Sequence, residues 1–157
     1  MTPTHVDIGL GIAIPVRVAF DGSTRAGDVT IEAELRSGKY VASRVIVVTD
    51  SSAGVTGAAL RDLAISDLIR QHAADGTIAD RISTLASEIL PPKGRTLTRD
   101  VLRLTTVAYR YGYAVSKKPT AEAHRLLGVS RATASRWVAA ARAEGLLGET
   151  VMRKAHV

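Results

Sequence analysis

One stretch constrains the fold more than any other, because it carries the signals of two short helices joined by a tight turn: residues 120–147, TAEAHRLLGVSRATASRWVAAARAEGLL. Thr120 is the expected N-cap of the first helix, since its hydroxyl can accept a hydrogen bond from a free backbone N–H. Gly128 ends that helix in the left-handed conformation of a sharp turn, and Ser130 caps the second helix, which Gly145 ends. The inward positions of the two helices are Ala123, Leu126, Leu127, Ala134, Trp137, Val138 and Ala141.

From Thr120 to Ala139 this stretch resembles the helix-turn-helix family of DNA-binding modules. The residues that carry the resemblance are Ala123, Leu127, Gly128, Val129, Ala134 and Trp137. His124 stands where most such modules have a small residue, so either the two helices pack less closely or the ring tilts outward. The longer phrase GVSRATASRWVAAARAEGLL also resembles the C-terminal tails of poorly characterised actinobacterial and actinophage proteins. The resemblance implies a trihelical DNA-binding domain, and the alternative is a helical hairpin that never touches DNA.

The charges are unevenly distributed along the chain. Residues 1–94 hold 9 Lys/Arg and 11 Asp/Glu, a net charge of −2, whereas residues 95–157 hold 12 and 4, a net charge of +8. A basic half beside a nearly neutral half indicates a polyanion-binding module attached to another unit. The Pro-Pro pair within residues 91–94 cannot continue a helix and marks a linker there. We therefore predict an N-terminal domain over residues 1–90 and a DNA-binding domain over residues 95–157.

Strands dominate the first fifty residues. Residues 6–20 are apolar and predict a strand broken by glycine and proline, and residues 21–28 have the composition of a loop. Residues 29–36 alternate between apolar and polar, as a half-buried strand does, and residues 40–48 return beside them after a turn at Ser37–Lys39. These segments predict a small antiparallel meander, which must pack on helices or on a second copy of itself.

Helices follow the strands. Apolar spacing predicts one helix or two short ones over residues 56–75, and a further helix over residues 78–90. The expected fold class is therefore α+β, with an N-terminal antiparallel β-meander and helices followed by a C-terminal trihelical domain.

The first helix of that trihelical domain is expected from about Thr98 to Val115, with two faces. Its apolar arc comprises Val101, Leu104, Ala108, Tyr111 and Val115. The opposite row of cations comprises Arg99, Arg103 and Arg110, with Arg95 just before the helix and Lys117 just after it. Such a row is either a solvated face or a contact for phosphates, and its place ahead of a helix-turn-helix favours phosphates.

Arg136 is the best candidate for a bidentate contact to guanine, because it points outward from the middle of the second helix of the turn motif. Ala132 and Ala139 offer only methyl contacts, whereas Thr133 and Ser135 reach bases or phosphates. Lys117 and Lys118 precede a helix N-terminus. The two lysines and this N-terminus form a phosphate site, or the lysines belong to a solvated linker. The full predicted set of DNA-binding residues is Ser130, Arg131, Ala132, Thr133, Ser135, Arg136, Ala139, Lys117, Lys118, Thr120, Arg95, Arg99 and Arg103.

The composition argues against several other classes of protein. The chain has no cysteine, its four histidines are scattered, and it carries no Gly-rich phosphate loop, so we expect neither an enzyme nor a metal or cofactor site. No apolar run approaches the ~20 residues of a membrane span, and no basic segment precedes the apolar start, so we expect a cytoplasmic protein.

The leading functional prediction is a sequence-selective double-stranded DNA-binding protein, a bacterial or phage transcriptional regulator that acts as a dimer. Residues 1–90 would then dimerise or sense a signal. A second class is a structural DNA-binding adaptor for genome packaging or recombination. A third is a protein-interaction adaptor that uses the trihelical module, which would be favoured if the arginine row were covered in the folded protein.

Overall fold

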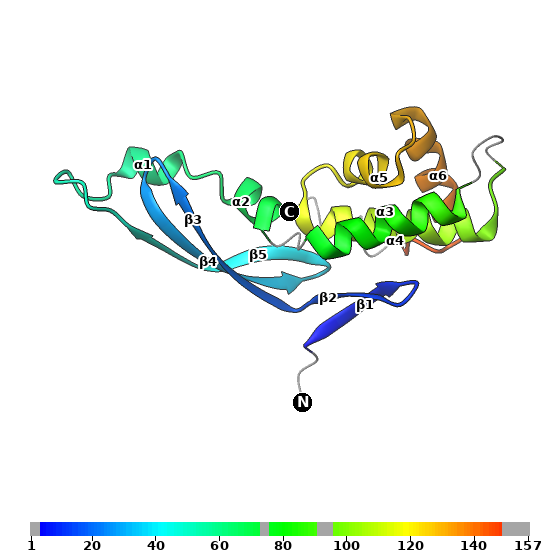
Figure 1. Cartoon of the computed structure of the whole chain (residues 1–157), viewed down its shortest axis with the longest axis horizontal. Helices are drawn as coiled ribbons and strands as arrows, with labels where there is room; N and C mark the ends of the chain where they lie inside the picture. The colour runs from blue at the N-terminus through cyan, green and yellow to red at the C-terminus, as the bar shows by residue number, and fades with distance from the viewer. Residues whose placement is uncertain (1–3, 73–75, 91–95, 149–157) are drawn as a thin grey trace.

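An arm of antiparallel strands extends from a body of helices (Figure 1). The arrangement is that of a computed structural model, which describes residues 4–72, 76–90 and 96–148. The strands are β1 (His5–Gly9), β2 (Ile12–Pro15), β3 (Arg17–Thr24), β4 (Gly27–Arg36) and β5 (Lys39–Val48). The helices are α1 (Gly57–Arg61), α2 (Ile65–His72), α3 (Gly76–Ile89), α4 (Arg99–Val115), α5 (Pro119–Leu127) and α6 (Arg131–Ala143). The predicted α+β class, with strands first and helices after them, is confirmed.

The arm is a three-stranded antiparallel sheet in the order β3-β4-β5. Alternation along β4 sends every second side chain into the core, as a period of two requires. The buried members are Val29, Ile31 and Ala33. Ser37 and Gly38 form the turn into β5 with φ of 51° and 80°, the positive values that suit a two-residue turn between twisted strands. The strands predicted at residues 29–36 and 40–48 are therefore confirmed.

Two predictions for the first strands were wrong: residues 6–20 do not form one strand, and residues 21–28 do not form a loop. The chain turns at Gly9–Gly11, so that β1 and β2 make a two-stranded hairpin of their own. Strand β3 continues to Thr24, whose hydroxyl accepts a hydrogen bond from the Ala26 N–H at 3.1 Å in the tight turn to β4. Of the polar residues that indicated a loop, Asp21, Ser23 and Asp28 lie on the solvent-exposed outward face of the sheet.

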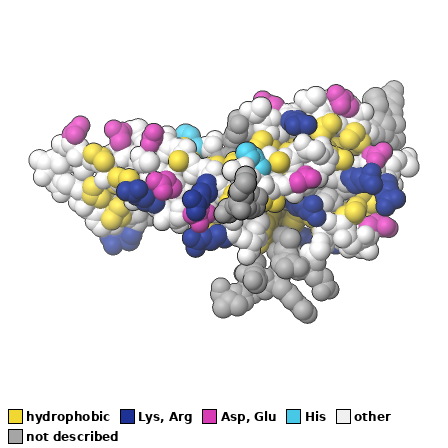
Figure 2. Space-filling view, turned by 90° about the horizontal axis from the view of Figure 1, so that it is seen from below, with side chains coloured by type: hydrophobic (Ala, Val, Ile, Leu, Met, Phe, Trp, Pro, Cys, Tyr) yellow, Lys and Arg dark blue, Asp and Glu magenta, His cyan; other side chains and the backbone are white. Residues whose placement is uncertain are grey.

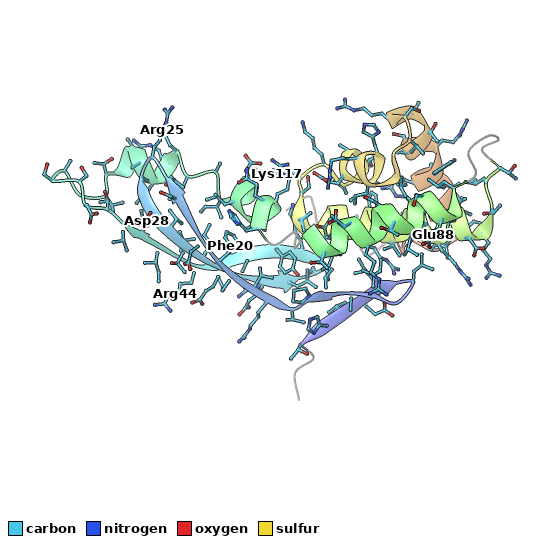
Figure 3. All side chains as sticks on the ribbon, in the orientation of Figure 1. Phe20, Arg25, Asp28, Arg44, Glu88 and Lys117 are labelled. Atoms are coloured by element: carbon cyan, nitrogen blue, oxygen red, sulfur yellow. The ribbon has the colours of Figure 1, made fainter. Side chains whose placement is uncertain are left out.

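Helices α1 and α2 cover one face of the arm (Figure 1). They are the two short helices that the prediction for residues 56–75 allowed, and the first is capped by Thr56, whose hydroxyl accepts from the Ala59 N–H at 3.2 Å. Phe20 lies beneath α2 (Figure 3), where its ring stacks on that of His72 with the centroids 4.9 Å apart. The inner face of the sheet is thus covered, while the outer face stays open to solvent.

The larger of two hydrophobic clusters among the described residues runs from the sheet into the helical body. It contains Ile31 of β4, Ile82 of α3, Leu104 of α4 and Trp137 of α6, all buried. Helix α4 supplies the link, because it contacts β5 of the sheet and also packs on α3, α5 and α6. The predicted linker, residues 91–94, lies outside the described residues, yet the chain before it and the chain after it share this core. The domain boundary predicted at residues 91–94 therefore stays a prediction, and the residues on its two sides contribute to one hydrophobic cluster.

Helix α4 is central to the body. Its predicted apolar arc is buried and Arg99 and Arg103 are exposed, as predicted, but the buried surface extends well beyond that arc. Thr105 and Thr106 are buried among its apolar residues, and their hydroxyls donate to carbonyls one turn earlier at 2.7 and 2.9 Å. Arg110 is half-buried and donates to the carbonyls of Ile8 (3.3 Å) and Leu146 (3.1 Å). Arg110 therefore joins the β1–β2 hairpin to the segment after α6, and is not part of an open cationic row.

Tyr40 fastens the arm to the β1–β2 hairpin. Its hydroxyl donates to the Pro15 carbonyl at 2.6 Å, and the residue is only 4% exposed. Burial raises the pKa of this hydroxyl from its ordinary 10.0 to about 12. Because the pKa is higher in the folded chain, ionisation favours the unfolded chain. The stabilising contribution is therefore complete below about pH 10 and is lost as the pH rises toward 12.

The free energy of unfolding should fall by about 1 kcal/mol between pH 9 and pH 11 on account of Tyr40 alone. Urea unfolding at the two pH values measures the decline. The variant Tyr40→Phe has no hydroxyl to ionise, so its free energy of unfolding should decline less between the two pH values. The variant Tyr113→Phe leaves Tyr40 in place and should show the full decline. An unchanged decline in Tyr40→Phe would contradict the assignment.

Candidate nucleic-acid interface

The two helices and the turn expected within residues 120–147 are present. Helix α5 begins at Pro119, whose missing N–H needs no partner there, so the predicted N-cap Thr120 was wrong and lies inside the first turn. Gly128 ends α5 with φ 62°, as predicted. The hydroxyl of Ser130 caps α6 by accepting from the Thr133 N–H at 3.1 Å, also as predicted.

Close contact between α4 and α5 fixes where this turn unit sits on the body. A Cβ atom added at Gly112 of α4 would lie 2.8 Å from both the Glu122 Cβ and the Pro119 carbonyl oxygen of α5. Only glycine permits that approach, and Ala123 of α5 is completely buried beside it. Figure 1 shows α5 and α6 on the side of the body that faces away from the β1–β2 hairpin.

His124 spans the turn. Its ring is half-buried, and Nδ1 is hydrogen-bonded to the Val129 carbonyl oxygen, just before the cap of α6. The ring nitrogen donates when Nδ1 carries the proton, because a carbonyl can only accept. His124 is therefore turned toward the Val129 carbonyl and joins the end of α5 to the start of α6.

Helix α6 presents one polar face to solvent and buries the other. The exposed residues are Arg131, Ala132, Ser135, Arg136 and Ala139, as predicted. The buried residues are Thr133, Ala134, Trp137, Val138 and Ala141. Thr133 corrects the prediction. It was expected to flank the outer face and reach DNA, yet it is 4% exposed and shares a 2.8 Å hydrogen bond with the Ser130 hydroxyl. It lies one turn before Trp137 on the inward stripe, so it belongs to the cap and the core.

The start of α5 and the start of α6 together border a surface hollow. Its lining residues are Lys118, Pro119, Thr120, Ala121, Arg131 and Ser135. Four of these were predicted to contact DNA, whereas the contributions of Pro119 and Ala121 were missed, because they follow only from how the two helices cross. Within the part of the chain that the structure describes, no carboxylate forms an ion pair with Lys117, Lys118, Arg131 or Arg136. All four are exposed, so this surface carries uncompensated positive charge.

The cations of α4 are not brought to this hollow. Arg103 precedes Gly112 by nine residues, which is two and a half turns, so it lies on the side of α4 away from α5. There it borders a second hollow with Leu10 of the β1–β2 turn and Leu146, and its guanidinium lies 3.9 Å from the Asp100 carboxylate. Arg99 is exposed at the first residue of α4, and Arg95 lies outside the described residues.

Among residues 4–72, 76–90 and 96–148, no three His, Asp or Glu side chains gather as metal ligands would. None of the helices described has the length and apolar character needed to cross a membrane. Comparison with protein families, with curated proteins and with solved structures found no match to this chain.

Proposed function

We propose that this chain is a sequence-selective, double-stranded DNA-binding protein of the helix-turn-helix type, acting as a dimer in bacterial or phage transcription. One observation carries the proposal: Arg131 and Ser135 on the exposed face of α6 line the same hollow as Lys118, which precedes α5. A recognition helix that enters the major groove needs such a face, and the helix before it needs cations for the flanking phosphates.

The bases would be read by α6. Arg136 is exposed near the middle of the helix, where its guanidinium fork can meet O6 and N7 of guanine. Ser135 beside it adds a short donor and acceptor, whereas Ala132 and Ala139 offer methyl groups for thymine. A single strong reader gives modest specificity per copy. Pairing of two copies on a two-fold symmetric site would supply the rest.

The phosphates would be held at the start of α5. The positive end of the α5 helix dipole lies at the hollow that Lys118 and Arg131 border, where the Ala121 N–H donates to the Lys118 carbonyl at 3.0 Å. Lys117 and Thr120 lie at the same end of the helix. This arrangement neutralises the DNA backbone without reference to sequence and releases counterions, which makes binding depend on salt.

Selection of bound duplexes from a random DNA pool at two salt concentrations tests the proposal. A two-fold symmetric motif that persists at the higher salt supports a dimeric regulator. Binding without a motif supports the structural adaptor instead. Failure to bind any duplex at low salt would refute DNA binding and leave a protein-interaction adaptor.

Replacing Lys118 by glutamine should weaken binding to every duplex alike and lower the slope of log K against log salt by about 1, since one phosphate contact is lost. Binding titrations across a salt series measure the slope. The matched control is Arg103→Gln, which removes the same charge from the side of α4 that faces the β1–β2 hairpin and should leave the slope unchanged. Equal effects of the two variants would contradict the proposed orientation on DNA.

A further inference from the structure

The outward face of the arm is built from four rows of side chains that cross all three strands. Strand pairing places the rows, from the body toward the free end of the arm, as Arg17-Glu34-Val41, Ala19-Glu32-Arg44, Asp21-Thr30-Ile46 and Ser23-Asp28-Val48. Every member is exposed or half-buried, and helices α1 and α2 lie on the other side of the sheet. Figure 3 shows Arg44 projecting away from those helices. This outer sheet face is thus free within the described chain.

An apolar column runs along β5, which forms one edge of the sheet. Val41, Ile46 and Val48 are 43%, 37% and 60% exposed, and Arg44 is the only charge between them. Figure 2 shows this side of the arm, with hydrophobic side chains lying between Lys or Arg and Asp or Glu. Exposed β-branched side chains on an edge strand are usually avoided, because they favour pairing with another chain.

The two ends of the outer sheet face carry opposite charge. Near the body, Arg17 and Arg36 both pair with the single carboxylate of Glu34 at 3.2 Å, which leaves one positive charge in excess. Toward the free end, the charges of the rows are Asp21 and Asp28. Asp21 accepts a hydrogen bond from the Thr30 hydroxyl at 2.6 Å, but within the described residues neither carboxylate pairs with a cation. When a second copy is turned end to end, its acidic end therefore faces the basic end of the first copy.

We propose that the outer sheet face is the interface with a second copy of this chain. The two sheets stack face to face about a two-fold axis that lies between them and runs across the strands. That axis places the Asp28 end of one copy over the Arg17 and Arg36 end of the other, and it also sets the two β5 columns against each other. A two-fold interface of this kind is isologous, since each copy uses the same surface. The inference rests on the dimer of the proposed function and names the surface that forms it.

Sedimentation of the full chain at tens of micromolar tests this interface. The unmodified chain should be a dimer, and Ile46→Glu should weaken dimerisation about tenfold or more by burying a carboxylate among apolar side chains. Leu97→Glu is the matched control, because it places the same charge on an exposed leucine ahead of α4 and should leave the dimer intact. Circular dichroism of each variant confirms that it folds.

Charge reversal tests the orientation of the two copies. Arg17→Glu and Asp28→Arg should each weaken the dimer when alone, because like charges then meet across the axis. An equimolar mixture of the two variants should recover it, since opposite charges then meet at both ends of the interface. Lack of recovery would overturn the stacking. A monomeric unmodified chain would overturn the whole inference. Binding of the same sample to duplex DNA at low salt shows separately whether the proposed function stands.

Discussion

Replacing Ile82 by alanine should lower the free energy of unfolding by about 2–5 kcal/mol. Ile82 lies on α3 and is 0% exposed, in the cluster that also holds Ile31 of the sheet and Trp137 of α6. The lost methylene and methyl groups no longer leave water on folding, and the backbone around so central a site cannot close the cavity fully. The strands and the turn unit should therefore lose stability together.

Two probes of urea unfolding distinguish a shared core from two independent ones. Trp137 is the only tryptophan, so its fluorescence reports on α6, whereas far-UV circular dichroism reports on all helices and strands. In Ile82→Ala both midpoints should shift by the same amount. The control Leu60→Ala, at a 49% exposed residue of α1, should change stability by less than about 0.5 kcal/mol. A fluorescence midpoint that stayed in place would show that α4, α5 and α6 fold independently of α3.

The turn unit was predictable because its signals are local. Gly128 requires a left-handed conformation and Ser130 caps a helix whatever lies around them, and both were found where the sequence placed them. The same holds for β4, where alternation needs only one buried face. Thr120 was misplaced as a cap by two residues, since Pro119 can begin a helix as well as precede one.

The rest depended on long-range packing. Helical spacing cannot show that α4 is surrounded on nearly all sides. Thr106 and Arg110 are polar and therefore predict a solvent-exposed face, whereas the structure shows them hydrogen-bonded to backbone carbonyls. Charge asymmetry describes a surface, so it could not reveal that α3 shares its core with α5 and α6. The hollow at the start of α5 and α6 likewise arises from the crossing of two helices, and the spacing of residues along either helix does not contain it.

Replacing Arg136 by alanine should cost about 1–3 kcal/mol of binding free energy at the preferred DNA site, because one bidentate contact to a base is removed. Arg136 is exposed on α6, and no described carboxylate pairs with it, so its loss should not disturb the fold. The expected loss is confined to the preferred site. Binding to a scrambled duplex should change far less, since that binding depends on phosphates.

The comparison that decides this interpretation of α6 is between Arg136→Ala and Lys118→Gln, each measured on a preferred and a scrambled duplex across a salt series. A base contact changes the ratio of the two affinities, whereas a phosphate contact changes both affinities and keeps their ratio. Arg136→Ala should therefore flatten the preference, and Lys118→Gln should preserve it while lowering the salt slope. If Lys118→Gln changed the preference while Arg136→Ala left it intact, the outer face of α6 would not lie in the major groove.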